Sequence, residues 1–249
     1  MFDLTIPADL FGNDFLIAGL AVFAASLIRG FSGFGSVLIT APMLSLVWGP
    51  TVGVPVAALI EIVPAIQLTP HAIRTAHWPT AWAMGLPAVV LLPVGSLVLL
   101  NAPAEEMRRV IAAIVLLLAI VMWIGWRYRG PRGLVPSGVV GALGGALAGA
   151  TGMGGPPAIL YLMSGDDDAA GVRANMIAYF TIIFVGILIT YGALGLVTAE
   201  VIWRIALMVP IYAVGVVIGT RMFGLASERT FRNIALATLA ASSTWVLLA

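Results

Sequence analysis

The sequence contains no cysteine and no lysine, and only 9% of its 249 residues are charged. Without cysteine the chain has no disulfide, no thiolate nucleophile and no thiolate-bound metal cluster. Soluble domains carry about 25% charged residues, so this chain lacks the composition of a water-facing surface. These absences disfavour an ordinary cytosolic enzyme and a nucleic-acid-binding protein.

Hydrophobic residues make up 61% of the chain. A bilayer core of about 30 Å needs roughly 20 apolar residues for each helical crossing. Apolar segments separated by proline, glycine and charge fall at residues 13–30, 33–48, 51–69, 80–101, 107–126, 136–149, 152–165, 172–197, 200–222 and 229–248. The first stretch has no basic residue before it, unlike a signal peptide, and is expected to be a retained span. The sequence therefore predicts an all-α, multi-pass protein of the lipid bilayer.

Two glycine-rich motifs are related to each other. The stretch Gly30–Ser36 (GFSGFGS) matches Gly149–Gly155 (GATGMGG) at an offset of 119 residues. In a second match between the two halves, Gly95-Ser96 corresponds to Gly219-Thr220 at an offset of 124 residues. We expect two repeats of about five segments each, residues 1–128 and 133–249, joined by a basic cytoplasmic linker at 129–132.

The arginines predict how the chain lies in the membrane, because cytoplasmic loops carry an excess of positive charge. With the linker in the cytoplasm, eight arginines fall on the cytoplasmic side and three outside. This places the N-terminus outside, and the odd number of segments per repeat inverts the second repeat relative to the first. The short pairs 13–30 with 33–48 and 136–149 with 152–165 are either two slim crossings or half-helices that turn back.

The glycine-rich breaks carry the functional prediction. Each follows a small polar residue, Ser32 or Thr151, which favours the N-cap position, so a new helix is expected to start there. A helix start inside the membrane presents free N–H groups and a positive dipole end, and its natural complement is an anion. Two such starts facing each other could bind one oxyanion. The alternative is tight helix packing, with both hydroxyls bonded to a preceding carbonyl.

The candidate substrate-binding residues surround these breaks. Arg29 either faces the anion or marks a cytoplasmic helix end. Asn175 and Tyr179 share one helix face, where they bind the substrate or form an interhelical bond. The full predicted set is Arg29, Ser32, Gly33, Phe34, Gly35, Ser36, Thr151, Gly152, Met153, Gly154, Gly155, Asn175 and Tyr179.

Glu61 is predicted to lie midway along the apolar segment 51–69. A carboxylate in such a place is protonated, paired with an arginine such as Arg29, or part of a proton pathway. Proton coupling and a neutral structural glutamate are the alternatives. His71, Arg74 and His77 are interpreted as a solvated loop, since no carboxylate accompanies them, and no metal or cofactor is expected.

The stretch Arg29–Ser36, followed by an apolar run with Pro42, and the stretch Gly149–Pro157 resemble the two signatures of the TauE/SafE family of membrane transporters, often called sulfite exporters. The resemblance extends over nearly the whole chain. It implies movement of small anions containing sulfur and oxygen, such as sulfite or organosulfonates, across the cytoplasmic membrane of a bacterium.

Together these observations predict a secondary transporter, and specifically an exporter, of a small anionic substrate, with proton coupling through Glu61. An anion channel and a non-transporting accessory protein remain the alternatives. A homodimer is compatible with this plan. An intramembrane enzyme is disfavoured, since the sequence shows no activated nucleophile or metal cluster.

Overall fold

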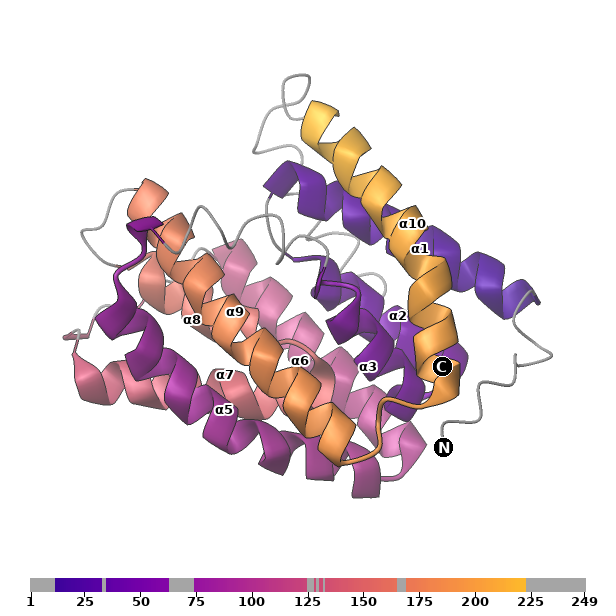
Figure 1. Ribbon diagram of the computed structural model, residues 1–249, viewed down its shortest axis with the longest axis horizontal. Helices are drawn as coiled ribbons and strands as arrows, with labels where there is room; N and C mark the ends of the chain where they lie inside the picture. Colours follow the sequence, from indigo (N-terminus) through magenta and orange to yellow (C-terminus); the bar gives the residue numbers. More distant parts are fainter. Residues whose placement is uncertain are drawn as a thin grey trace. The chain divides into compact units, whose positions relative to one another are not determined.

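The protein is all-helical throughout the part that the computed structural model describes, residues 12–32, 35–62, 74–124, 128, 130–131, 133–164 and 169–222. The helices are drawn in Figure 1. They are α1 (Asn13–Ser32), α2 (Ser36–Trp48), α3 (Pro50–Leu59), α5 (Trp78–Asn101), α6 (Ala104–Ile124), α7 (Leu134–Thr151), α8 (Gly155–Leu162), α9 (Ala169–Ala193) and α10 (Ala199–Met222).

Five of these helices, α1, α5, α7, α9 and α10, are long and apolar enough to cross a membrane. A helix rises about 1.5 Å per residue, so the 20 residues of α1 span about 30 Å. The 13 residues of α2 reach only about 20 Å, and the 8 residues of α8 about 12 Å. The prediction of a multi-pass helical protein is confirmed, and each short pair consists of one long helix followed by one that is too short to cross.

The predicted apolar segments correspond closely to the helices, with one difference. Within the predicted segment 51–69, α3 ends at Leu59, and Ile60 and Glu61 form a turn, while residues 63–69 lie outside the described residues. An apolar run does not by itself mark the end of a helix, because both sides of the turn remain hydrophobic. The last predicted segment, 229–248, lies outside the described residues.

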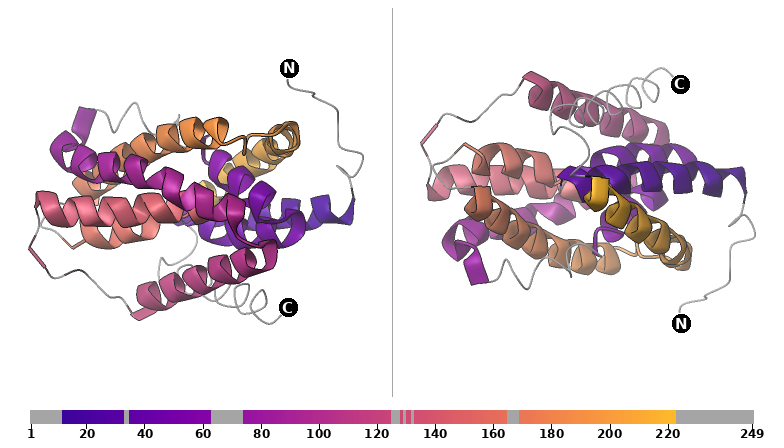
Figure 2. Two further views of the ribbon diagram at one scale, coloured as in Figure 1. Left: turned by 90° about the horizontal axis from the view of Figure 1, so that it is seen from below. Right: turned by 90° about the horizontal axis from the view of Figure 1, so that it is seen from above.

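The chain divides into two compact units that each combine segments from both halves of the sequence. Unit 1 consists of Met1–Ile60, Ala102–Ile124 and Gly195–Ala249, and it holds α1, α2, α3, α6 and α10. Unit 2 consists of Glu61–Asn101 and Gly125–Leu194, and it holds α5, α7, α8 and α9. The largest helix contact in unit 1 joins α1 to α10 (Figure 1), and the largest in unit 2 joins α5 to α7 (Figure 2).

Glycines bring these two helix pairs into backbone contact. In unit 1, a Cβ at Gly30 of α1 would overlap the carbonyl oxygen of Val216 and lie 2.9 Å from the amide nitrogen of Thr220. In unit 2, a Cβ at Gly149 of α7 would overlap the carbonyl oxygen of Leu92 and lie 2.8 Å from the amide nitrogen of Ser96. Only glycine permits an approach this close between helix backbones.

The reverse contacts follow the same scheme. Gly219 of α10 faces the carbonyl oxygen of Leu27, and Gly95 of α5 faces that of Ala146. The paired positions in α1 and α7 differ by 119 residues, and those in α5 and α10 by 124, the offsets that relate the sequence motifs. The same helix pair therefore occurs once in each unit, and each copy joins the first helix of one sequence half to the fourth segment of the other.

Candidate anion site at the helix breaks

The break in unit 2 begins where α7 ends, at Thr151. Gly152 follows in the left-handed conformation, with φ of 75°, and its N–H donates to the carbonyl of Ala148 at 2.9 Å. The Thr151 hydroxyl donates to the carbonyl of Leu147 at 2.7 Å and accepts the N–H of Met153 at 3.3 Å. These contacts close the end of α7 in the manner of a glycine C-cap.

The new helix, α8, starts at Gly155 with Gly154 as its N-cap residue. The expectation that Thr151 would be the N-cap is wrong, because its hydroxyl is bonded back to the preceding turn and so ends α7. Pro156 and Pro157 lie in the first turn of α8 and have no N–H. The amides of Gly154 and Gly155 are therefore the donors at this helix start.

The break in unit 1 has the same order of elements. Helix α1 continues through Ser32, and α2 starts at Ser36 with Gly35 as its N-cap residue, at φ of 94°. The expectation that Ser32 starts the new helix is therefore also wrong, because the glycine with positive φ marks the turn between the helices. Gly33, Phe34 and the side chain of Ser32 lie outside the described residues.

Ser36 is held inside unit 1 by a tyrosine. Its hydroxyl accepts a hydrogen bond from the Tyr212 hydroxyl of α10 at 3.2 Å, and both side chains are buried. The carbonyl of Ser36 accepts the Thr40 hydroxyl at 3.1 Å. The start of α2 is thus fixed against α10, the helix that also contacts Gly30.

Two further tyrosines of α9 contact the break in unit 2. The Tyr191 hydroxyl lies 3.1 Å from the carbonyl oxygens of both Ala148 and Gly149, at the end of α7. The Tyr179 hydroxyl donates to the carbonyl of Gly154 at 3.4 Å, and its ring packs on that of Phe180. Both tyrosines are buried, and so is Met153 in the turn between α7 and α8. Tyr179 was predicted to lie near this site, whereas Tyr191 and Tyr212 were missed.

Asn175 makes an interhelical contact. Its Oδ1 accepts the backbone N–H of His77 at 2.6 Å, which ties α9 to the start of α5. The ring of His77 in turn lies 2.9 Å from the Thr80 hydroxyl in the first turn of α5. Arg74 and His77 are exposed, but Arg74 is helical and only His77 lies in the loop before α5, while His71 lies outside the described residues. No group of three metal-ligating side chains occurs among the described residues.

Arg29 lies in the last turn of α1 and is half-buried. A cation is favoured at this position by the negative end of the helix dipole. Its neighbour Gly30 contacts α10, and the Gly30 carbonyl accepts the Thr220 hydroxyl at 3.2 Å. Arg29 is thus placed beside the break by the backbone contact of α1 with α10.

Glu61 lies in the turn that follows α3 and is half-buried. The apolar segment in which Glu61 was predicted to lie is interrupted at this turn, because α3 ends two residues earlier. Its carboxylate is therefore attached to a helix end, where the backbone is not committed to a regular helix.

The helices and their breaks define a class of protein. Long membrane helices that stop at a glycine turn, each followed by a short apolar helix, are a building element of membrane transporters, which use the free backbone groups to bind their cargo. Comparison of the sequence with known protein families identifies the particular family. The family described as sulfite exporter TauE/SafE matches residues 18–246. The chain belongs to this family of membrane transporters and is not an enzyme. Searches of curated proteins and of solved structures found no match.

Proposed function

We propose that this transporter exports small sulfur-containing oxyanions, such as sulfite or organosulfonates, across the bacterial cytoplasmic membrane. The observation that carries the proposal is the pair of interrupted helices, α1 with α2 and α7 with α8. The start of each short helix offers amide donors and a positive dipole end, which suit a small anion with several acceptor oxygens. Membership of a sulfite exporter family supports this class of substrate.

At the first break, Arg29 supplies the positive charge. Its planar guanidinium can donate two parallel hydrogen bonds to one oxyanion, which a lysine cannot do. Gly35 and Ser36 supply backbone donors at the start of α2, and we assign Ser32, Gly33 and Phe34 to the same binding segment. The buried Tyr212 holds Ser36 in place and is a positioning residue.

At the second break, the amides of Gly154 and Gly155 are the proposed donors. Gly152 and Met153 form the turn that exposes them, and the Thr151 hydroxyl stabilises that turn through its contacts to Leu147 and Met153. Tyr179 holds the carbonyl of Gly154. In this division of roles only the first break is assigned a cation, and the attraction of the second break for an anion is assigned to its backbone dipoles.

Glu61 is the proposed site of proton coupling. It lies in an apolar stretch of sequence, where an ionisable residue is rare and marks a candidate functional site. Protonation and release at Glu61 would allow proton entry to drive anion export. A Glu61→Gln variant that still shows uptake driven by a pH gradient would remove this role.

The proposed transporter has two repeats of opposite orientation in the membrane and an N-terminus outside the cytoplasm. The odd number of segments per repeat and the distribution of the arginines support it. Exchange of the cargo between the two sides of the membrane would then follow from an alternation between two related conformations.

Saturable uptake into proteoliposomes tests the proposed function. We expect purified protein to transport sulfite with saturation kinetics, and we expect Arg29→Lys to raise the apparent KM for sulfite about tenfold because the bidentate contact is lost. The matched control is Arg221→Lys, which makes the same change in the last turn of α10 at an exposed position. It should leave uptake unchanged.

Two outcomes would contradict the proposal. Equal kinetics in both variants would remove Arg29 from the site. Absence of saturable transport for sulfite and for a panel of organosulfonates by the unmodified protein would overturn the function itself, and flux that rises without saturation would identify a channel.

A further inference from the structure

The last turn of α2, in unit 1, holds two buried polar atoms that have no hydrogen-bond partner. Among the described residues, the hydroxyl oxygen Oγ of Ser45 and the indole nitrogen Nε1 of Trp48 are both of this kind. Ser45 is only 1% exposed. The two residues are three positions apart and therefore lie on the same side of the helix. Unsatisfied buried donors are rare in folded proteins, and two on one helical turn indicate a missing acceptor.

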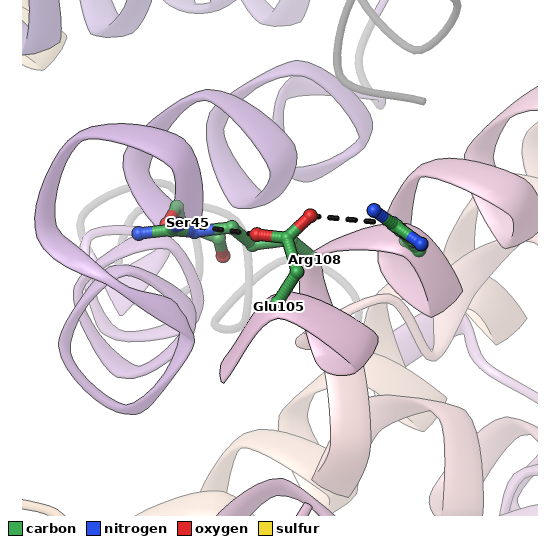
Figure 3. A network of polar contacts seen from close by, with 4 residues as sticks. Ser45, Glu105 and Arg108 are labelled. Atoms are coloured by element: carbon green, nitrogen blue, oxygen red, sulfur yellow. Dashed lines mark hydrogen bonds and ion pairs between the residues drawn. The ribbon is translucent and has the colours of Figure 1, made fainter. Parts of the chain in front are cut away.

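Two guanidinium groups contact this same turn. Nε of Arg108, from α6, donates to the carbonyl oxygen of Ser45 at 3.1 Å (Figure 3). Arg204, from α10, lies over the indole of Trp48, with 4.3 Å between its Cζ atom and the ring centroid. Arg204 is 7% exposed, so its charge is almost completely removed from water. The unsatisfied donors of α2 thus lie beside two positive charges.

Each of these two guanidinium groups forms an ion pair with a glutamate carboxylate of its own helix. Glu105 lies 3.5 Å from Nη1 of Arg108 and 3.2 Å from Nε of Arg109 (Figure 3). Glu200 lies 2.6 Å from Nη2 of Arg204. The side chains of Glu105 and Glu200 are 54% and 39% exposed, so both carboxylates can move into solvent. Neither satisfies Ser45 Oγ or Trp48 Nε1.

The chemistry of these groups selects the ligand. An indole N–H and a guanidinium can only donate hydrogen bonds, and a serine hydroxyl can donate one. A ligand that satisfies all of them must carry several acceptor oxygens and a negative charge. Helix starts add to this preference, because α3 begins directly after the Gly49 that ends α2, and Arg108 and Arg204 each lie near the start of their helices.

We propose that Ser45, Trp48, Arg108 and Arg204 form an oxyanion-binding site, the α2-end site. It takes a tetrahedral group of the sulfate or phosphate type, either as a free ion or as the head group of an anionic phospholipid. The group displaces the carboxylates of Glu105 and Glu200 from the guanidinium groups and accepts the hydrogen bonds of Trp48 and Ser45.

This site is distinct from the glycine break. The break lies at the start of α2 and the new site at its end, and 13 residues of helix place them about 20 Å apart. The inference does not rest on the proposed function, since it concerns binding and can be measured without transport.

Binding of a free anion is tested by titrating the full chain, in a neutral detergent, with sodium sulfate and measuring the dissociation constant. We expect Trp48→Phe, which keeps the ring and removes the N–H, to raise the dissociation constant for sulfate about tenfold, the effect of one lost hydrogen bond to a charged ligand. Ser45→Ala should weaken binding similarly without disturbing the packing, because the lost hydroxyl has no partner in the protein. Glu200→Gln should tighten sulfate binding, because it removes a competing carboxylate.

The matched control is Trp123→Phe, the same change at an exposed position of α6. It should bind sulfate like the unmodified protein.

Native mass spectrometry with dioleoyl phosphatidylglycerol, and with the zwitterionic choline lipid as comparison, tests the lipid form. Loss of retained phosphatidylglycerol in Trp48→Phe and Ser45→Ala, but not in Trp123→Phe, would assign the site to a lipid head group. Loss of sulfate binding alone would assign it to a free anion. Sulfate and phosphatidylglycerol binding that is unchanged in both Ser45→Ala and Trp48→Phe would overturn the proposal, whether or not the protein transports sulfite.

Discussion

Hydroxyl groups of single residues determine which backbone groups at a helix break are already hydrogen-bonded within the protein and which are not. At the second break, Thr151 and Tyr191 together engage Leu147, Met153, Ala148 and Gly149, so most of the polar groups at the end of α7 are satisfied within unit 2. The amides of Gly154 and Gly155 then stand out as the donors at the start of α8. Under the proposed function, selectivity for an anion at this break would arise because the acceptor groups nearby are occupied while donors are left for the cargo.

The Tyr191 hydroxyl gives a prediction at this scale. Tyr191→Phe should destabilise the protein by about 1 to 3 kcal/mol, because the Gly149 carbonyl loses the Tyr191 donor and the Ala148 carbonyl is left with the Gly152 N–H. In a chain of this size this corresponds to a fall in Tm of a few degrees, measured by thermal unfolding in detergent.

Tyr128→Phe is the matched control. The Tyr128 hydroxyl donates to the carbonyl of Pro131 at 3.1 Å in an exposed position, so water can replace the bond. Its loss should change stability by no more than about 0.5 kcal/mol. An equal fall in Tm for both variants would show that the α7 carbonyls do not depend on Tyr191.

At the scale of helices, backbone contact through glycine is the main feature of both units. The α1 and α10 pair and the α5 and α7 pair each have glycines that face a carbonyl of the opposite helix in both directions. Such contacts allow van der Waals packing over the full width of the helices, which is how helices associate in lipid, where the hydrophobic effect contributes little.

Gly149→Ala should therefore lower the stability of unit 2. The new methyl group would overlap the carbonyl of Leu92, and helix separation to relieve it should cost about 1 to 3 kcal/mol. Gly192→Ala is the control, because it lies at an exposed position of α9 with no atom within 4 Å of the added Cβ. It should leave stability unchanged or raise it by up to about 1 kcal/mol, since alanine favours the helix. Thermal unfolding of the two variants compares these effects, and a stable Gly149→Ala protein would contradict the close contact.

Most of the helices and both helix breaks could be predicted from the sequence. Hydrophobic runs of about 20 residues fix where membrane helices lie, and glycine clusters correctly indicated both breaks. The end of α3 at Leu59 was missed because no glycine or proline marks it. The N-cap residues were misassigned, because a serine or threonine before glycine can end one helix as readily as start the next.

Long-range partners could not be predicted in this way. The contact between Asn175 and His77 joins residues 98 positions apart, and nothing in either local sequence specifies the other. The α2-end site was missed for the same reason, although one signal was available. Arg204 lies within an apolar run, as Arg29 does, and a buried arginine in such a run requires a partner.

At the scale of the whole molecule, neither half of the sequence forms a compact unit alone. Unit 1 takes α1 from the first half and α10 from the second, while unit 2 takes α5 from the first and α7 from the second. The offsets of 119 and 124 residues relate the contacting positions of one pair to those of the other. Each pair takes one helix from each half of the sequence.

Separate expression of the halves tests this arrangement. We expect residues 1–132 and residues 133–249 each to aggregate or be degraded when produced alone, because α1 and α7 both lack their partners. Co-expression should yield a complex that co-purifies through a tag on one half and unfolds cooperatively. A monodisperse, cooperatively unfolding fragment obtained from either half alone would contradict the exchange of helices between halves.

The contact of α1 with α10 has a consequence for how the protein is made. Helix α1 is synthesised before α10, which begins about 170 residues later, and at about 5 to 20 residues per second this is a delay of roughly 8 to 35 s. During that interval the glycine surface around Gly30 is without its α10 partner. Biogenesis of this transporter therefore includes a waiting stage in which α1 is inserted but not yet docked, and factors that shield nascent membrane helices would act at that stage.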